Sequence, residues 1–487
     1  MILPNSLFVL IQFRATRCLY HVNAISNYCP KELGFVWKKA PLFASLIFCL
    51  TSFAFGADVA EAGGQRKLDP RLSRYFTTKE RETRALAKQL NLQVQPEVWD
   101  YFAAGAREDW AAADRLFDGI SRKWRQGQNT SAIAGPVLEA VLFYEGLTSM
   151  DLKFAESFAR DIINSIPSGS IYFGGTDPGR GLVTAFVPSV PEAKPFFVLS
   201  QNPLGDLTYL DYVRAIYGQT LYIPSAGDWQ KAMDDYAVSA KARLDADQLK
   251  PGENFEESEN GKLKPAGNVA WMEVNALLAK LIFEKNPRHE FYIEESMPMD
   301  WMYPHLSPHG LILKLNRKPL ATFSEKIVKE DREYWREQTK RLLGGWLTNE
   351  TPVKVLCEFL EKVYVEKDFG RFAGDVDYMK ARQGHNGQRI YGHLRMGQVH
   401  VYEWQMNHVT APEEKKRMLR ELDFAYRQSI ALNPFDPEKV KRYVSLLRDH
   451  ERLDDARRML KAGRIINPRS TRLRQLEAEL NLGIDER

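Results

Sequence analysis

Cysteine is scarce in this chain, with four among 487 residues. Cys18, Cys29 and Cys49 all precede residue 57, which leaves Cys357 as the single thiol of the remaining sequence. One thiol forms no internal disulfide, so a chain of this length has to be stabilised by its hydrophobic core. Cys357 lies at helical spacing in "VKVLCEFLEKVY", which indicates a buried apolar side chain rather than a reactive one.

Long apolar runs are absent after residue 60, and this predicts no transmembrane helix there. An earlier run, "APLFASLIFCLTSFAFGA", follows Lys38 and Lys39, and its Ala54 and Gly56 fit a cleavage site. We therefore predict that 1–56 is a signal peptide whose start is placed too far upstream; an uncleaved anchor is the alternative. Either way the protein is expected to be periplasmic or otherwise extracytoplasmic.

Excess charge of either sign is also absent once 1–56 is removed, because basic and acidic residues are then equal in number. This balance gives no support for a nucleic-acid partner. The sequence contains no H-E-x-x-H zinc motif, and we expect neither a metal nor a cofactor.

The periodicity of the chain predicts an α/β plus α protein. After a linker at 57–78, a helical, tetratricopeptide-like region is expected at 79–166. Short apolar runs alternate with helical segments at 167–320, which predicts a Rossmann-like parallel sheet domain. Within it, "QTLYIPS" is expected to be a strand, and Asn260-Gly261 a hairpin turn. A helical domain is predicted at 321–487.

An internal repeat supports that last range. Asn433-Pro434 and Asn467-Pro468 are 34 positions apart, which is the period of tetratricopeptide repeats. Between them, four residues occupy the positions at which such repeats pack their paired helices: Tyr443, Leu447, Ala456 and Leu460. We therefore expect the α/β domain to be flanked by helical repeats.

The most distinctive stretch is the glycine-rich "GSIYFGGTDPGRGLVTAF", where a strand, a loop and a helix are expected in succession. It matches neither the Walker A nor the Rossmann phosphate motif. Six of its residues are candidates for an anion or sugar cradle: Gly174, Gly175, Thr176, Asp177, Gly179 and Arg180. The alternative is a tight turn in which Arg180 is paired internally. The number of glycines favours the cradle, because one turn needs fewer.

Two further clusters follow expected strands. Gln201, Asn202 and Asp206 come after "PFFVLS" and would share the carboxyl edge of a parallel sheet with the glycine loop. Polar loop chemistry, with Asp206 capping a helix, is the alternative. Glu294, Glu295 and Trp301 follow another strand. They favour a structural role, with ligand binding or paired-carboxylate catalysis as alternatives.

Three segments in order carry a family resemblance: "SIYFGGTDPGRGLVTAF", "PFFVLSQNPLGDLTYLDYVRAIYG" and "EFYIEESMPMDWMYPHLSPHGLILKLNR". Together they resemble the extramembrane domain of bacterial multi-spanning membrane proteins similar to protein O-mannosyltransferases. That family has Gly-Asp-Asn-Asp-Thr in the first loop; here Asp177 matches one acidic position and the other is lost. The resemblance implies an α/β module with tetratricopeptide repeats. Because transfer is attributed to the family's membrane half, it argues against independent glycosyl transfer.

These observations predict an exported, non-catalytic binding or scaffold protein. Its helical repeats would hold a protein or peptide partner, and its α/β domain could hold a glycan or small anion. The alternative is a soluble glycan-processing or glycosyl-transfer enzyme that uses Asp177 with Glu294 or Glu295.

Overall fold

The computed structural model describes residues 68–128, 131–187, 196–257, 263–294, 299–380 and 386–479. In these ranges the chain is mostly helical and divides into two compact units. The first unit takes residues up to 144 together with 200–287, and the second takes 145–199 together with residues from 288 onward. A helical protein with an α/β part is therefore confirmed, whereas the expected domain ranges stay a prediction. The expected signal peptide lies outside the described residues.

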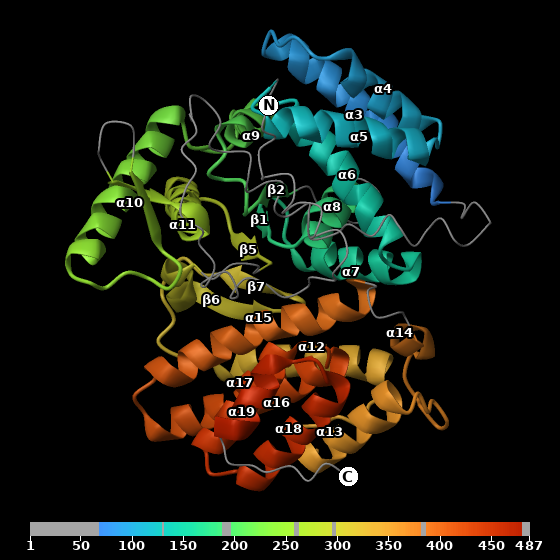
Figure 1. Cartoon of the computed structure of the whole chain (residues 1–487), viewed down its shortest axis with the longest axis vertical. Coiled ribbons are helices and arrows are strands. Elements are labelled where there is room, and N and C mark those ends of the chain that lie inside the picture. The colour runs from blue at the N-terminus through green and yellow to red at the C-terminus, as the bar shows by residue number, and fades with distance from the viewer. Residues whose placement is uncertain are drawn as a thin grey trace, which may run out of the picture. The chain divides into compact units, whose positions relative to one another are not determined.

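A run of helices opens the first unit (Figure 1). The helices are α3 (Pro70–Gln89), α4 (Pro96–Ala106), α5 (Trp110–Arg125) and α6 (Ala134–Thr148), the last of which ends in the second unit. Asp69 and Asp109 begin α3 and α5 by accepting hydrogen bonds from backbone N–H groups of their first turns. The apolar faces of these helices meet in an aromatic core around Phe76, whose ring lies 5.2 Å from that of Tyr101.

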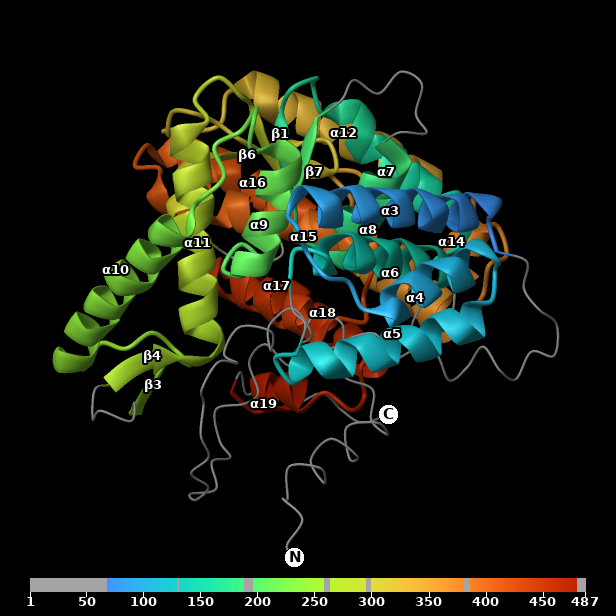
Figure 2. The same cartoon turned by 90° about the horizontal axis from the view of Figure 1, so that it is seen from above.

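The rest of the first unit is a pair of long helices with a hairpin beside them. It contains α9 (Leu207–Tyr217), α10 (Ala226–Asp245), β3 (Asn254–Glu257), β4 (Leu263–Ala266) and α11 (Gly267–Lys285). β3 and β4 pair in antiparallel fashion and contact α10 and α11 (Figure 2). The expected turn at Asn260-Gly261 falls between these strands and lies outside the described residues.

The strand expected in "QTLYIPS" is absent from this described part of the chain, so that prediction was wrong. The segment is irregular backbone between α9 and α10. A single side chain explains the difference. Asn286 accepts a hydrogen bond from the Tyr222 N–H at 2.9 Å and donates one to the Tyr222 carbonyl at 3.0 Å. Because this amide satisfies the groups that a neighbouring strand would pair, no ladder forms.

The second unit contains a five-stranded sheet with the order β2-β1-β5-β7-β6. Its strands are β1 (Ile171–Gly174), β2 (Phe197–Ser200), β5 (Phe291–Ile293), β6 (Leu306–His309) and β7 (Ile312–Leu315). β1 pairs with β5 in parallel, but β7 is antiparallel to both β5 and β6. The sheet is therefore mixed, and the prediction of a parallel sheet has to be corrected. The apolar runs of β1 and β5 are buried throughout, as expected for central strands.

The mixed topology arises from a tight hairpin. His309 pairs with Ile312, so Gly310 and Leu311 alone form the turn between β6 and β7. Gly310 has φ +58°, which glycine adopts at no steric cost in two-residue hairpin turns. Two strands joined so closely must be antiparallel, whereas a parallel pair needs a long crossover.

Helices make up the remainder of the second unit. α7 (Leu152–Ser165) packs on α8 (Asp177–Phe186), and α8 also contacts β1. After the 3₁₀ helix η3 (Asp300–His305), the later helices are α12 (Glu325–Leu343), α13 (Val353–Leu360), the π-helix η4 (Glu361–Val365), α14 (Val376–Lys380), α15 (Asn386–His408), α16 (Pro412–Leu432), α17 (Pro437–Asp449), α18 (Leu453–Ile466) and α19 (Thr471–Glu479). α12 and α15 both contact β6.

The last five helices are arranged as successive neighbours. α15 packs along α16, α17 along α18, and α19 contacts both members of the second pair. The four residues that marked the repeat in the sequence (Tyr443, Leu447, Ala456 and Leu460) are all buried in that pair. Helical hairpins are thus present, while their membership of the tetratricopeptide class stays a prediction. None of the helices in the described ranges is both long and apolar enough to cross a membrane.

Candidate functional site

The glycine-rich segment links β1 to α8 in the second unit. Thr176 is the N-cap of α8, and its hydroxyl oxygen accepts a hydrogen bond from the Gly179 N–H at 3.1 Å. Asp177 and Pro178 form the first helical turn. The loop therefore presents backbone N–H groups at a helix N-terminus, the arrangement that binds anions in many proteins.

The anion at this position is Glu294, which follows β5 and is fully buried. Its Oε2 accepts hydrogen bonds from the backbone N–H groups of Gly175, at 3.1 Å, and Thr176, at 3.0 Å. Its Oε1 accepts one from the Thr176 hydroxyl at 2.5 Å. The Tyr172 hydroxyl donates to Oε2 at 3.4 Å. The loop is thus occupied by a carboxylate of the protein itself.

The packing around this carboxylate explains one of the glycines. A Cβ at Gly179 would lie 1.5 Å from Glu294 Oε2, so any larger residue would displace the carboxylate. Burial raises the pKa of Glu294, and the donors on Thr176 and Gly175 oppose that rise. A carboxylate enclosed in this way has no open path for exchanging a proton with a bound substrate, which weighs against a catalytic role.

Arg180 and Asp177 form an ion pair one turn apart on α8, and both side chains are largely buried. The positive charge of Arg180 also favours the charged form of Glu294 and opposes the rise of its pKa that burial causes. The Arg180 Nε is buried and has no hydrogen-bond partner among the described residues. The cation therefore balances carboxylates of its own unit, as the tight-turn alternative predicts.

The other residues near Glu294 in sequence do not extend this cluster into a metal site. Glu295 lies outside the described residues, and Trp301 lies half-buried on η3. His305 Nδ1 is 2.7 Å from the Asn316 carbonyl, and His309 Nε2 is 2.8 Å from the Ser165 carbonyl. In the described ranges, no group of three or more His, Cys, Asp or Glu side chains could hold a metal ion.

Gln201, Asn202 and Asp206 belong to the first unit, whereas the glycine loop belongs to the second. Gln201 is fully buried. Asp206 is the N-cap of α9, and its Oδ1 accepts from the Thr208 N–H at 2.8 Å. Its Oδ2 is buried without a partner in the part of the chain that the structure describes, and burial raises the pKa of this carboxyl.

Two residues that the sequence did not point to hold this polar segment in place. Asn275 of α11 accepts a hydrogen bond from the Gly205 N–H at 2.5 Å and donates one to the Asn202 carbonyl at 2.8 Å. The Trp271 indole, one turn earlier on α11, donates to the same carbonyl at 3.2 Å. These contacts fix the backbone of the segment, and none of them leaves a reactive group exposed.

No family model matches this chain, and neither a curated protein nor a solved structure matches it.

Proposed function

We propose that this chain is an exported, non-catalytic binding protein whose last helices, α15 to α19, hold a segment of a partner protein. The observation that carries the proposal is the serial packing of the α15–α16 and α17–α18 hairpins followed by α19. Stacked helix pairs of this kind build continuous surfaces that bind extended segments. The resemblance of 167–320 to extramembrane domains of protein O-mannosyltransferase-like proteins forms part of the same proposal.

A row of charges across three of these helices supports a polar binding face. Arg442 of α17 lies 3.8 Å from Glu403 of α15 and 3.4 Å from Glu438 of its own helix. Glu438 in turn lies 3.2 Å from Arg472 of α19. All four side chains are partly exposed. Charged side chains of a partner segment could therefore replace one member of these ion pairs at little desolvation cost.

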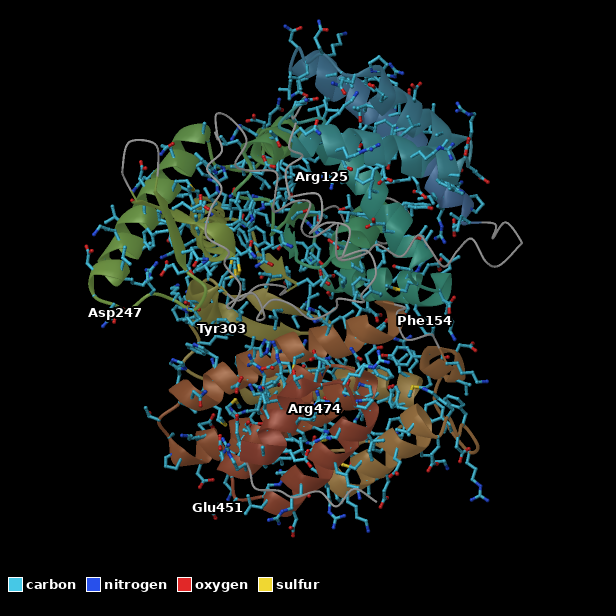
Figure 3. All side chains as sticks on the ribbon, viewed as in Figure 1. Arg125, Phe154, Asp247, Tyr303, Glu451 and Arg474 are labelled. Atoms are coloured by element: carbon cyan, nitrogen blue, oxygen red, sulfur yellow. The ribbon has the colours of Figure 1, made fainter. Side chains whose placement is uncertain are left out.

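Lys441 extends this row with a positive charge. It lies one turn from Glu438 on α17 and has no ion-pair partner in the described part of the chain. Figure 3 labels two residues near the ends of neighbouring helices, Glu451 in the turn after α17 and Arg474 on α19. An unpaired cation beside a row of exchangeable ion pairs favours an acidic partner segment.

The glycine loop has a structural role in this proposal. Its backbone N–H groups at Gly175 and Thr176 already donate hydrogen bonds to Glu294, and its cation, Arg180, already forms an ion pair with Asp177. These contacts support a scaffold function for the α/β part rather than the paired-carboxylate enzyme considered above.

A site-specific crosslinker tests the binding surface. A photoreactive amino acid replaces Lys441 in the full-length protein expressed in its own cells, and adducts are identified by mass spectrometry. The matched control places the same residue at Lys461, an exposed position on α18, a helix that contributes none of the charges in this row. We expect one dominant protein adduct from position 441 and none from position 461. Equal adducts at both positions, or none at 441, would contradict the proposal.

A further inference from the structure

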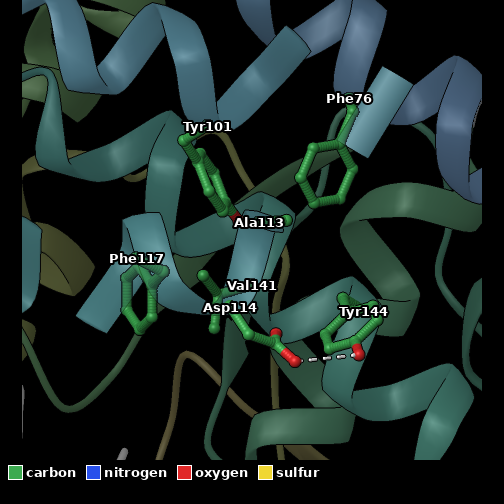
Figure 4. A pocket seen from close by; sticks show the side chains of 7 residues that line it. All are labelled: Phe76, Tyr101, Ala113, Asp114, Phe117, Val141 and Tyr144. Carbon is green, nitrogen blue, oxygen red and sulfur yellow. Dashed lines mark hydrogen bonds between the residues drawn. The ribbon is translucent and has the colours of Figure 1, made fainter. Parts of the chain in front are cut away.

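A small cavity lies in the first unit, where α3, α4, α5 and α6 meet (Figure 4). Aromatic rings of Phe76, Tyr101, Phe117 and Tyr144 surround it, and Ala113 leaves the space open. Phe76 and Tyr101 are almost completely buried, while Phe117 and Tyr144 are partly exposed. The cavity therefore has an aromatic floor and a side that faces solvent.

A single carboxylate lies at this cavity. Asp114 of α5 is exposed as a residue, and its Oδ2 lies 3.4 Å from the Tyr144 hydroxyl (Figure 4). No Lys, Arg or His of the described ranges forms an ion pair with it. Asp118, one turn further along α5, adds more negative charge. Partial desolvation of the Asp114 carboxyl by the protein atoms around it raises its pKa, and the charge of Asp118 adds to the rise. A positive charge is what this arrangement lacks.

Rings around a carboxylate with no cationic partner form a site for a cation. Aromatic faces attract ammonium groups through their quadrupoles, and a carboxylate adds a charge-assisted hydrogen bond. The cavity volume of about 20 Å³ slightly exceeds what one water molecule requires. A terminal –NH₃⁺ group is close to water in size, whereas a trimethylammonium group is much larger.

We propose that this cavity binds the primary ammonium group of an alkylamine, with Asp114 accepting its hydrogen bonds and the rings contacting its charge. The same chemistry is present in a free diamine and in the lysine side chain of a peptide. The proposal does not depend on the partner surface of α15 to α19, which belongs to the other unit.

Ligand-observed NMR and calorimetry on the full-length protein test the ligand class. The probes are n-butylammonium, its neutral analogue 1-butanol and its N-trimethylated analogue. We expect saturable binding of n-butylammonium, with a Kd on the order of millimolar, and binding of both analogues weaker by about tenfold. Equal binding of 1-butanol would identify an apolar packing gap and overturn the proposal, as would the absence of saturable n-butylammonium binding.

Variants locate the site. Asp114→Asn should weaken n-butylammonium binding by about tenfold, because it removes the charge but keeps the shape. Asp118→Asn is the matched control on the same helix and should change binding by less than about twofold, since that charge does not line the cavity. Tyr144→Phe keeps the ring and should retain most binding. Unchanged affinity in Asp114→Asn, with the fold intact by circular dichroism, would overturn the proposal.

The source of the amine is distinguished with two further ligands. A free 1,5-diaminopentane and a capped lysine dipeptide are titrated into the same protein. A preference for the diamine assigns the site to a metabolite-like amine, and a preference for the peptide assigns it to lysine side chains. If neither competes with n-butylammonium, the site does not recognise primary amines as a class and the proposal fails.

Discussion

Arg180 is a buried cation, and its one ionic partner among the described residues is Asp177, three residues earlier in the same helix. Because it lies beside Glu294, it belongs to a compact group of buried charges and is not a solvent-facing side chain that could bind a ligand. Removing a buried cation leaves its carboxylate unpaired in a poorly solvated place, which costs more free energy than the loss of a surface pair.

Arg180→Ala should therefore lower the free energy of unfolding by about 1–3 kcal/mol, measured by urea denaturation. Arg336→Ala is the control, because that side chain is 68% exposed and its loss should cost less than about 0.5 kcal/mol. An Arg180→Ala protein of unchanged stability that no longer bound an anion would instead support the ligand cradle.

Asp161 of α7 gives the second unit a pH dependence. Burial raises the pKa of its carboxyl to about 6 from an ordinary 3.8, although Arg341 at 3.9 Å opposes the rise. Because the folded state holds this proton more tightly than the unfolded chain does, the contribution of Asp161 to stability is highest below about pH 4. It falls as the pH rises to about 6 and is constant above that value.

The expected loss of stability from Asp161 is up to about 3 kcal/mol between pH 4 and pH 7. Asp161→Asn cannot ionise, so the stability of this variant relative to the wild type should increase over the same interval. Denaturation of both proteins at pH 4, 5, 6 and 7 measures the difference. A difference that is flat with pH would show that the carboxyl titrates normally.

At the scale of secondary-structure elements, a buried ion pair fixes α15 against α12. Arg395 Nη1 donates to both oxygens of Asp331, at 2.9 and 3.0 Å, and both side chains are almost fully buried. The Tyr402 hydroxyl donates to Asp331 at 2.8 Å, and Arg395 Nε donates to Gln428 of α16 at 3.0 Å. The pair therefore joins three helices through directional bonds.

Arg395→Met should destabilise the second unit by about 3–5 kcal/mol, because it leaves Asp331 charged, buried and short of donors. The double variant Asp331→Leu/Arg395→Met should recover most of this loss, since no charge then remains buried. On the same helix α12, Lys329→Met removes one member of an exposed pair and should cost less than about 0.5 kcal/mol. A double variant no more stable than Arg395→Met would contradict this explanation.

Local patterns predicted the elements better than their pairing. The helices and the buried strands β1 and β5 follow directly from apolar spacing, and Gly310 marks the turn that makes the sheet mixed. The role of Glu294 could not be predicted in this way, because its partners Gly175 and Thr176 are more than 100 positions away in the sequence. The same holds for Asn286, whose bonds to Tyr222 replace an expected strand.

At the scale of the molecule, each unit has its own buried polar network. In the first unit, Lys79 of α3 donates to Glu139 of α6 at 2.5 Å, and Glu139 accepts from the Tyr212 hydroxyl of α9 at 2.9 Å. The negative charge of Glu139 raises the pKa of Lys79 well above its usual value despite burial. This network holds together the two stretches of sequence that form the first unit.

Calorimetry of the whole chain should resolve two unfolding transitions, because chains with separate cores rarely unfold in one step. Lys79→Met should lower the temperature of one transition, since it leaves Glu139 without its cation, and Arg395→Met should lower that of the other. The double variant Lys79→Met/Arg395→Met should show both decreases in transition temperature, each as large as in the single variant. A single transition that both variants lower equally would show that the units unfold as one.

The pairing of β1 with β5 also has a consequence for how the chain is made. Ile171 aligns with Phe291, so β1 leaves the ribosome about 120 residues before the strand that covers one of its edges. At ordinary translation speeds this interval is on the order of ten seconds. During that time the apolar "IYFG" has one edge without its native partner in the nascent polypeptide, and a holding chaperone that binds short apolar segments would shield it from aggregation.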